Sequence, residues 1–249
     1  MKQKKRVRQI RFDIVTTFPN IFDSYFNESI IKRAREKKIV DIRAVGIRDF
    51  ASGKYKKLDD IPYGGGAGMV LMAEPILKAV GNVLKRSKPS GTKIVILSAK
   101  GKQFNQKIAY DWAKKYDRIV LISGRYEGID ERVKNILHAE EISMGPYVLT
   151  DGDVAAMAVV SAVARLIPGV IRLESLKEES HWNLLLKREV NARVHPERSL
   201  GTANGLEYPH YTRPEVLKWP PGKSGKIYRV PKVLLSGNHK KIAEWRLEE

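Results

Sequence analysis

The chain has 249 residues, no cysteine and a formal net charge of +18, with 46 Lys and Arg against 28 Asp and Glu. Hydrophobic residues make up 43% of it, which supports a sizeable core and excludes a disordered or collagen-like protein. The absence of cysteine excludes a disulfide framework, thiolate catalysis and cysteine-based zinc or iron–sulfur sites. No apolar run reaches the ~18 residues of a membrane span. The basic N-terminus lacks the apolar segment of a secretory signal. The absence of cysteine fits a cytoplasmic protein, which is the location that we expect.

The positive charge is distributed unevenly along the chain. The first eleven residues carry six basic side chains and no acid, whereas residues 135–164 contain no Lys or Arg. A surplus of this size favours a nucleic acid as partner, because Lys and Arg gain affinity by releasing counterions from phosphates. The alternative is that the lysines only keep the protein soluble. The stretch without basic residues predicts an uncharged or acidic, mostly apolar pocket inside a basic exterior.

Strand-like and helix-like segments alternate through the first two thirds of the chain. Apolar and β-branched runs predict strands at residues 10–18, 39–45, 93–97 and 118–122. Apolar residues at helical spacing predict helices at residues 27–38 (with Asn27 as the N-cap), 69–84, 103–115, 130–137 and 154–167. We interpret residues 52–68 as a long loop, and residues 141–144 and 147–149 as short extended pieces.

This alternation predicts an α/β fold in which a parallel sheet carries helices on both faces. Ligands of such sheets bind beyond the carboxyl ends of the strands. Glycine-containing turns are predicted at that edge, at residues 98–101, 123–128 and 144–152. These three loops are expected to form one pocket.

The character of the sequence changes after Arg172. Residues 1–172 are predicted to form the first domain, and the polar residues 173–205, which lack a clear period, are interpreted as a linker. Residues 206–249 contain three closely spaced prolines and a short predicted helix after Asn238. They predict a small basic second domain.

The most glycine-dense segment is YGGGAG at residues 63–68. Glycines let the backbone approach a ligand closely or adopt positive φ. The segment is not a P-loop, because no Gly-Lys-Ser/Thr follows it. Its composition leaves a mobile loop and a ligand-contacting loop equally open. Asp59 and Asp60 precede it and are placed to accept hydrogen bonds from a base.

A second motif, SGRYEGIDER at residues 123–132, directly follows a buried strand. Its charged side chains are hard to place unless they face a ligand. The other interpretation is helix capping by Asp130, with Glu131 in the first turn. Both interpretations hold together if Gly124 and Glu127 face the pocket.

Few other residues suggest a site for chemistry. A carboxylate of the Glu178–Glu179 pair would suit a general base beside a pocket, although an acidic pair in a linker is more often only solvated. The five histidines show no metal-ligand spacing, so no structural zinc and no metal ligands are predicted.

Six segments, read in order along nearly the whole chain, resemble the signature blocks of the bacterial tRNA (guanine-N1)-methyltransferase family of the TrmD type. They are DDIPYGGGAGMV (59–70), ISGRYEGIDERV (122–133), EEISMGPYVLTDGD (140–153), AVARLIPGV (162–170), PHYTRPEV (209–216) and VPKVLLSGNHKKIAEWR (230–246).

The resemblance implies a SPOUT methyltransferase fold, in which a parallel sheet is threaded into a deep trefoil knot and a small, mostly helical C-terminal domain follows. It implies an obligate homodimer with active sites at the subunit interface. The methyl donor would be S-adenosylmethionine. The substrate would be N1 of the guanosine at position 37 of tRNA, immediately 3′ of the anticodon. It also raises a Mg²⁺ requirement, for which Glu127 would be the carboxylate to examine.

Carried over by position, the resemblance implies a donor site made mostly of three loops. Its residues would be Leu97, Ser98, Gly124, Tyr126, Glu127, Ser143, Met144, Gly145, Pro146, Tyr147, Val148, Leu149 and Gly152. Such a lining suits the donor, because S-adenosylmethionine carries a sulfonium cation and an apolar adenine.

The resemblance also assigns the catalytic and RNA-binding residues. Glu179 would remove the N1 proton of guanine, and Arg165 would stabilise the negative charge that develops on O6. The residues implied to contact the RNA are Asp59, Asp60, Tyr63, Gly64, Gly65, His210, Tyr211, Arg213 and Asn238.

Some positions depart from the family pattern. Glu179 stands where Asp is more usual, and Glu178 is an alternative base. Pro146, Asp151 and Ala155 replace Asp, Gly and Pro in the donor-loop block, and Asp151 adds a charge there. These departures leave open a catalytically impaired tRNA-binding protein on the same fold.

Overall fold

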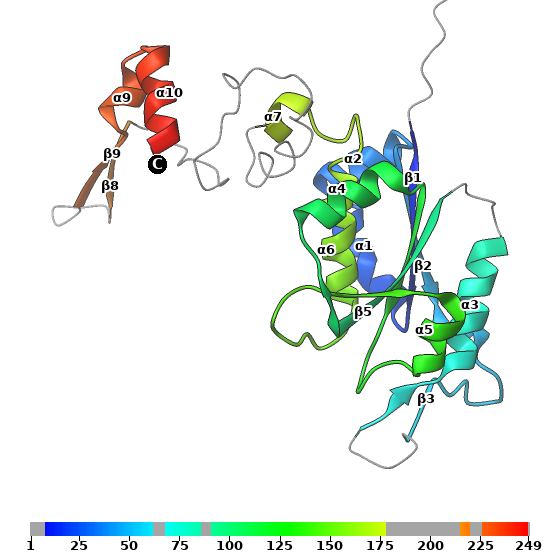
Figure 1. Cartoon of the computed structure of the whole chain (residues 1–249). Coiled ribbons are helices and arrows are strands. Elements are labelled where there is room, and N and C mark those ends of the chain that lie inside the picture. The colour runs from blue at the N-terminus through cyan, green and yellow to red at the C-terminus, as the bar shows by residue number, and fades with distance from the viewer. Residues whose placement is uncertain (1–7, 62–67, 86–90, 178–214, 220–225, 249) are drawn as a thin grey trace, which may run out of the picture. The chain divides into compact units, whose positions relative to one another are not determined.

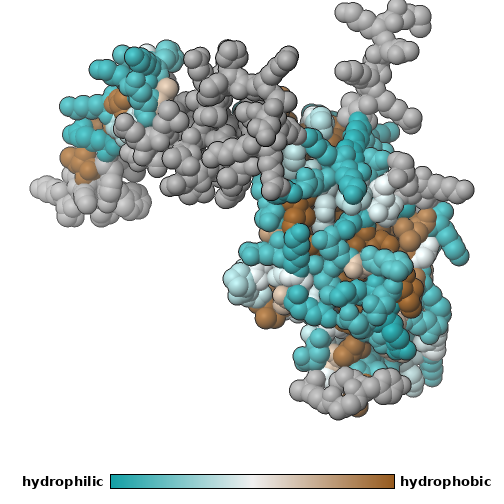
Figure 2. All heavy atoms as spheres, in the orientation of Figure 1, coloured by the Kyte–Doolittle hydropathy of each residue, from teal (hydrophilic) through white to brown (hydrophobic). Residues whose placement is uncertain are grey.

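The computed structural model describes residues 8–61, 68–85, 91–177, 215–219 and 226–248. The chain divides into two compact units, Met1–Arg172 and Leu173–Glu249, which are described separately below. Figure 2 shows hydrophilic residues over most of the visible face of the first unit, with smaller hydrophobic areas between them.

The first unit is built on a five-stranded sheet in the order β2-β1-β6-β5-β7, and all four pairings are parallel. The central strand β6 is buried at every position, as expected where helices cover both faces. The four strands predicted from apolar runs, and the fifth predicted as a short extended piece, are confirmed. The strands are β1 (Ile10–Thr16), β2 (Val40–Gly46), β5 (Thr92–Gln103), β6 (Arg118–Ser123) and β7 (Glu140–Ser143).

Helices pack on both faces of this sheet, as predicted (Figure 1). Side chains alternate along β1, so Phe12 and Ile14 join one core while Val15 joins the other. The first core is covered by η1 (Pro19–Phe22), α1 (Asp23–Phe26), α2 (Ser29–Glu36), α4 (Gln106–Lys115) and α6 (Asp153–Ala164). The second is covered by η2 (Ile47–Phe50), α3 (Ala73–Lys85) and α5 (Glu131–Leu137).

The turn predicted at residues 98–101 is wrong. Strand β5 continues through these residues to Gln103, with a shift in its register against β7 between Leu97 and Lys102. The reason lies at Gly101, where an added Cβ would lie 2.5 Å from backbone atoms of Glu141 and Ile142. This glycine serves a close approach of two strands rather than a turn.

Two helix starts also differ from the sequence prediction. Asn27 does not cap α2; it is the C-cap of α1, and its side-chain oxygen accepts a hydrogen bond from Arg35 at 2.5 Å. The helix predicted from residue 69 begins at Ala73, because β4 (Val70–Leu71) pairs with β3 (Asp59–Asp60) in an antiparallel hairpin. The interpretation of residues 52–68 as loop therefore missed β3. Residues 147–149 form no strand.

The described part of the second unit contains α7 (Leu173–Lys177), β8 (Val216–Trp219), β9 (Lys226–Arg229), α9 (Lys232–Leu235) and α10 (His239–Glu248). Strands β8 and β9 pair antiparallel. The helix predicted after Asn238 is confirmed, and the Asn238 side chain accepts a hydrogen bond from the backbone N–H of Lys241 at 3.2 Å. Among the described residues, no helix has the length and apolar character needed to span a bilayer.

Candidate functional site

A cavity of about 390 Å³ lies at the carboxyl edge of the sheet. Its walls come from the middle of β5, the loop after β6 with the start of α5, the loop after β7 and the start of α6. Most of the residues expected in one pocket do line it, namely Leu97, Ser98, Gly124, Tyr126, Glu127, Ser143, Met144, Tyr147, Val148, Leu149 and Gly152. Gly145 and Pro146 belong to the same loop but do not line the cavity.

The cavity has an apolar floor and an exposed apolar loop beside it. Ile96 and Leu97 of β5 and Ile142 of β7, which line it, are buried. Tyr147 and Val148 on the loop after β7 are 56% and 83% exposed. The floor is therefore preformed, while the loop presents apolar side chains that a ligand or a partner surface can cover.

The expected absence of basic residues from this pocket is wrong. Lys100 and Lys134 line the cavity and form a closed ring with Glu131 and Glu141. The Nζ of Lys100 lies 2.9 Å from Glu131 and 3.2 Å from Glu141, and the Nζ of Lys134 lies 3.3 Å and 2.6 Å from the same two carboxylates. Residues 135–164 do lack Lys and Arg, but β5 and α5 bring these lysines in from elsewhere in the chain.

The ring favours the charged forms of Lys100, Lys134 and Glu131. Hydrogen bonding to Glu131 is the largest cause that raises the pKa of Lys100, and hydrogen bonding to Glu141 is the largest cause for Lys134. Hydrogen bonds from both lysines, that from Lys100 first, lower the pKa of Glu131. The i,i+3 spacing of Glu131 and Lys134 was a usable sequence signal. Their meeting with Lys100 and Glu141 depends on the tertiary fold.

The loop after β6 has both roles expected of it. Asp130 accepts a hydrogen bond from the backbone N–H of Arg132 at 3.0 Å and caps α5, and Glu131 lies in the first turn. The side chain of Arg132 is the largest cause that lowers the pKa of Asp130. Gly124 and Glu127 line the cavity, as predicted for the ligand-facing part of the motif.

The extra charge of Asp151 is accommodated by neighbouring groups. One carboxylate oxygen accepts a hydrogen bond from the backbone N–H of Asp153, the first residue of α6, at 2.9 Å. The other lies 3.8 Å from the guanidinium of Arg125, which also stacks over the ring of Phe18 at 4.7 Å. Asp151 therefore joins the loop after β7 to the loop after β6.

The other predicted site residues lie away from the cavity or outside the described residues. Arg165 is the C-cap of α6, at the opposite end of that helix from the cavity, and does not line it. Asp60 is exposed, and a hydrogen bond from Lys57 is the largest cause that lowers its pKa. Tyr63, Gly64, Gly65, Glu178, Glu179, His210, Tyr211 and Arg213 fall outside the described residues.

In the part of the chain that the structure describes, no group of three or more His, Asp or Glu side chains is arranged to hold an ion.

A parallel sheet with a cavity at its carboxyl edge is typical of α/β proteins that bind a small ligand where their strands end. Comparison with known families makes this more specific. Residues 10–249 match the family described as tRNA (Guanine-1)-methyltransferase TrmD. The chain belongs to this family, so the resemblance found in the sequence is confirmed.

Individual relatives support the same assignment. A tRNA (guanine-N(1)-)-methyltransferase of Clostridioides difficile is 44% identical over 96% of this chain and 92% of its own length. One from Thermomicrobium roseum is 46% identical over 95% of this chain and 77% of its own length. The crystal structure of a tRNA (m1G37) methyltransferase from Aquifex aeolicus covers 96% of this chain and 88% of its own, with 34% identity and a TM-score of 0.69.

Proposed function

We propose that this chain transfers a methyl group from S-adenosylmethionine to N1 of the guanosine at position 37 of tRNA. The observation that carries the proposal is the combination of family membership over residues 10–249 with a cavity lined by all but two of the expected donor-site residues. The net charge of +18 supports an RNA substrate, because phosphate contacts dominate such binding. Action on tRNA makes the cytoplasm the expected location.

The cavity suits the proposed donor. Its volume of about 390 Å³ falls within the usual range of small-molecule sites. Leu97 and Ile142 offer apolar contacts to an adenine. Backbone groups of Ser143, Met144 and residues 147–149, which also line the cavity, can hydrogen-bond its polar edge. The Glu127 carboxylate can face a positive charge. When bound, the donor supplies a methyl group activated by its sulfonium sulfur.

The proposed chemistry at the guanine falls to Glu179 and Arg165. N1 of guanine carries a proton at neutral pH and becomes a strong nucleophile only when that proton is removed. Glu179 is the proposed base, with Glu178 as the alternative. Arg165 would hold the negative charge that develops on O6 during deprotonation. A Mg²⁺ requirement involving Glu127 stays a prediction.

A homodimer would explain where Arg165 lies. Helix α6 has 12 residues and is therefore about 18 Å long, with the cavity at its first turn and Arg165 just past its last. This separation exceeds the reach of one arginine side chain, so a second copy would have to bring Arg165 to the donor. Active sites at a subunit interface meet this need.

The surface around α6 supports such an interface. Val154 on α6 is 51% exposed. Phe18, the N-cap of η1, is also exposed, as are Ile21 of η1 and Tyr25 of α1. The hydroxyl of Tyr25 hydrogen-bonds Ser161 of α6 at 2.9 Å, which joins the two parts of this surface. Exposed apolar side chains on adjoining elements are typical of surfaces that a partner covers.

The SPOUT knot is also part of the proposal. It is supported by the return of the loop after β7 against the end of β6, where the Gly152 N–H donates a hydrogen bond to the carbonyl of Gly124 at 2.9 Å. A Cβ on Gly152 would lie 2.9 Å from the Cα of Ser123. So close a passage suits a loop threaded beside another.

The decisive experiment is methylation of two tRNA transcripts that differ only at position 37, one with G and one with A. Primer extension and nucleoside mass spectrometry should show 1-methylguanosine at position 37 in the G transcript alone. A folded preparation that binds the transcript but forms no 1-methylguanosine would favour the impaired RNA-binding protein instead. The extra charge of Asp151 was one reason to consider that alternative. In the structure, Asp151 has the Asp153 N–H and Arg125 as partners, so this reason no longer applies.

The role of Glu179 is tested with a neighbour as control. Glu179→Ala should lower kcat by a factor of about 10² to 10⁴ with little change in tRNA affinity. Glu178→Ala should retain most of the activity. The reverse pattern would assign the base to Glu178, and equal losses of turnover and tRNA binding would contradict a catalytic role.

A further inference from the structure

The loop after β6 is hydrogen-bonded along its edge to the strand that follows the glycine-rich segment. The backbone N–H of Glu127 donates to the carbonyl of Met69 at 3.1 Å, and that of Leu71 donates to the carbonyl of Gly128 at 3.0 Å. The N–H of Asp130 returns a bond to Leu71 at 3.0 Å. The segment at residues 68–71 thus forms a fixed backing for the loop that carries Glu127.

Backbone conformation fixes the direction of Glu127 further. The residues on either side of it, Tyr126 and Gly128, have φ values of 56° and 127°. A left-handed φ is costly for a tyrosine, so this conformation must be held by the surrounding structure. The backbone on both sides of Glu127 is therefore constrained. The position of the Glu127 carboxylate then depends on the residues that its side chain contacts.

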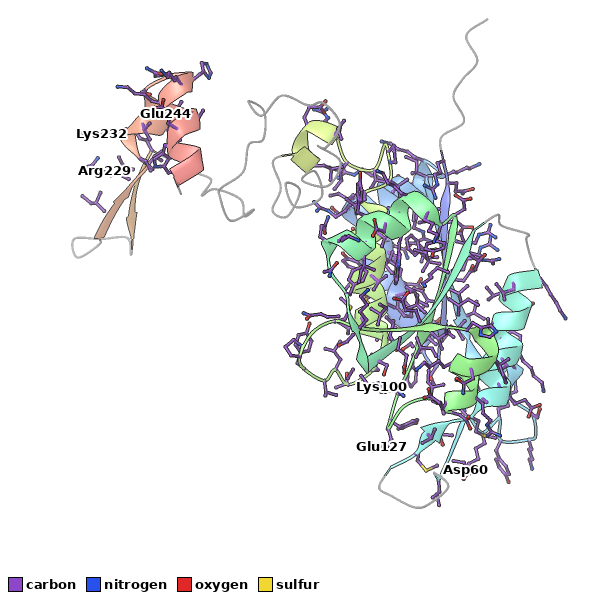
Figure 3. All side chains as sticks on the ribbon, in the orientation of Figure 1. Asp60, Lys100, Glu127, Arg229, Lys232 and Glu244 are labelled. Carbon is purple, nitrogen blue, oxygen red and sulfur yellow. The ribbon has the colours of Figure 1, made fainter. Side chains whose placement is uncertain are left out.

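The residue that the Glu127 side chain lies against is Gly68. A Cβ added at Gly68 would lie 2.6 Å from Cγ and 2.7 Å from Cδ of Glu127, well inside the contact distance of carbon atoms. The glutamate side chain therefore occupies the space that any other residue would need. Figure 3 shows Glu127 beside the β3–β4 hairpin, and Gly68 stands two residues before β4.

We propose that Gly68 is a positioning residue for the Glu127 carboxylate in the donor site. This inference rests on the proposed function, in which Glu127 lines the cavity for S-adenosylmethionine. The missing side chain at Gly68 leaves room for the carboxylate at the cavity wall, where it can face the positive charge of the donor. The composition of the glycine-rich segment left open whether it is a mobile loop or a ligand-contacting loop. Its last glycine, Gly68, would serve the donor site.

The physical consequence of Gly68→Ala is specific. Glu127 is exposed and its side chain is flexible, so the added methyl group can be accommodated by swinging the carboxylate away. Folding is retained in that case, but the donor loses a charged partner. A lost charge-assisted contact of this kind lowers affinity by about tenfold.

The chain offers a matched control for backbone strain. Gly68 has a φ of +77° and Gly53 a φ of +80°, but nothing lies within 4 Å of a Cβ added at Gly53. Alanine at either position imposes the same left-handed conformation on a residue that disfavours it. Only the substitution at Gly68 also displaces Glu127, so the difference between the two variants isolates the positioning effect.

The test measures the Kd of S-adenosylmethionine by calorimetry and its KM and kcat with the G37 transcript. Gly68→Ala should raise Kd and KM about tenfold, and Gly53→Ala should leave both near the wild-type values. In a Glu127→Ala background, Gly68→Ala should add no further loss, since the group it displaces is gone. Glu127→Gln, which introduces no steric conflict, should weaken donor binding to a similar extent.

Two results would overturn the inference while the proposed function stands. One is equal behaviour of Gly68→Ala and Gly53→Ala in an active enzyme. The other is the same loss from Gly68→Ala whether or not Glu127 is present. If Gly68→Ala does not fold, a Glu127→Gln variant with normal donor affinity would overturn it. Failure of the wild-type protein to bind S-adenosylmethionine would instead overturn the proposed function, and this inference with it.

Discussion

The two edges of the central sheet use their polar groups in different ways. Toward the amino ends of the strands, Arg118 is buried, lies 2.6 Å from Asp13 and donates a hydrogen bond to the carbonyl of Val83. Arg8 donates hydrogen bonds to the carbonyl of Ala113 in the last turn of α4 and to that of Tyr116 just after it, both at 2.8 Å. Charges at this edge serve the fold itself.

The carboxyl edge is less fully satisfied. In the part of the chain that the structure describes, three buried side-chain atoms have no hydrogen-bond partner: Thr17 Oγ1, Ser123 Oγ and Asp153 Oδ2. All three belong to the ends of β1 and β6 or to the start of α6. Unsatisfied polar atoms and the positive φ of Tyr126 each carry an energetic cost, and here they lie where the cavity forms. A protein can carry such a site because the opposite edge stabilises the sheet.

The largest expected effect comes from breaking the amino edge. Arg118→Met should lower the free energy of unfolding by about 3–5 kcal/mol, because Asp13 would remain buried without its partner. Urea denaturation measures the change, and donor affinity of the folded fraction should stay near the wild-type value.

Two further variants sharpen this prediction. Arg43→Met removes a more exposed arginine, paired with Asp41 at 3.2 Å, and should cost about 1 kcal/mol or less. The double variant with Asp13→Val and Arg118→Met should recover much of the lost stability, since no buried charge remains. A double variant as unstable as the sum of both single ones would contradict the role of the pair.

Local chemistry made parts of this structure predictable from sequence. Strand β6 could be predicted because its run RIVLI is short, apolar and rich in β-branched residues, as is typical of a strand covered on both faces. The cap at Asp130 followed from the side chains that suit a helix start. The donor-site residues, in contrast, came from the resemblance to a family, since loop composition at the sheet edge indicates a pocket but no particular ligand.

The errors arose where distant segments decide the conformation. Gly101 has the composition of a turn, yet its role is set by the backbone of Glu141 and Ile142, which approach it from another strand. Lys100 and Lys134 enter the cavity wall from outside the stretch that lacks basic residues. Local periodicity does not reveal the role of Gly101 or the position of the two lysines, because both depend on which segments become neighbours in the fold.

A smaller effect is expected from the bridge at the carboxyl edge. Asp151→Ala should lower stability by about 1 kcal/mol, because the Asp153 N–H at the start of α6 loses its acceptor. It should also weaken donor binding severalfold, because the loop after β7 loses its link to Arg125. Thermal unfolding and calorimetry measure the two effects.

Asp151→Asn separates these two contributions. Asparagine can still accept the hydrogen bond at the start of α6, so stability should stay close to the wild type, but it cannot attract Arg125. Salt screens the ion pair between Asp151 and Arg125, so it should weaken donor binding in the wild type. This contribution to the salt dependence should be absent from the asparagine variant. If asparagine behaves like alanine in both measurements, the attraction to Arg125 contributes nothing to the site.

The smallest effect concerns the charged ring of the cavity wall, and it depends on pH. The pKa of Glu131 is lowered, so its contribution to stability is present above its ordinary pKa of 4.5 and is lost as the pH falls through the folded value. The pKa values of Lys100 and Lys134 are raised, so their contribution is present below 10.5 and is lost as the pH rises through the folded values.

Glu131→Gln should therefore lower the melting temperature between about pH 5 and pH 10, and the difference from wild type should shrink on both sides of that window. Glu74→Gln, which disrupts the single i,i+4 ion pair between Glu74 in the first turn of α3 and Lys78, should change the profile less. A difference that stays constant from pH 3 to pH 11 would mean that Glu131 acts through packing at the start of α5, and the ring would then be an arrangement of charges without energetic consequence for this edge.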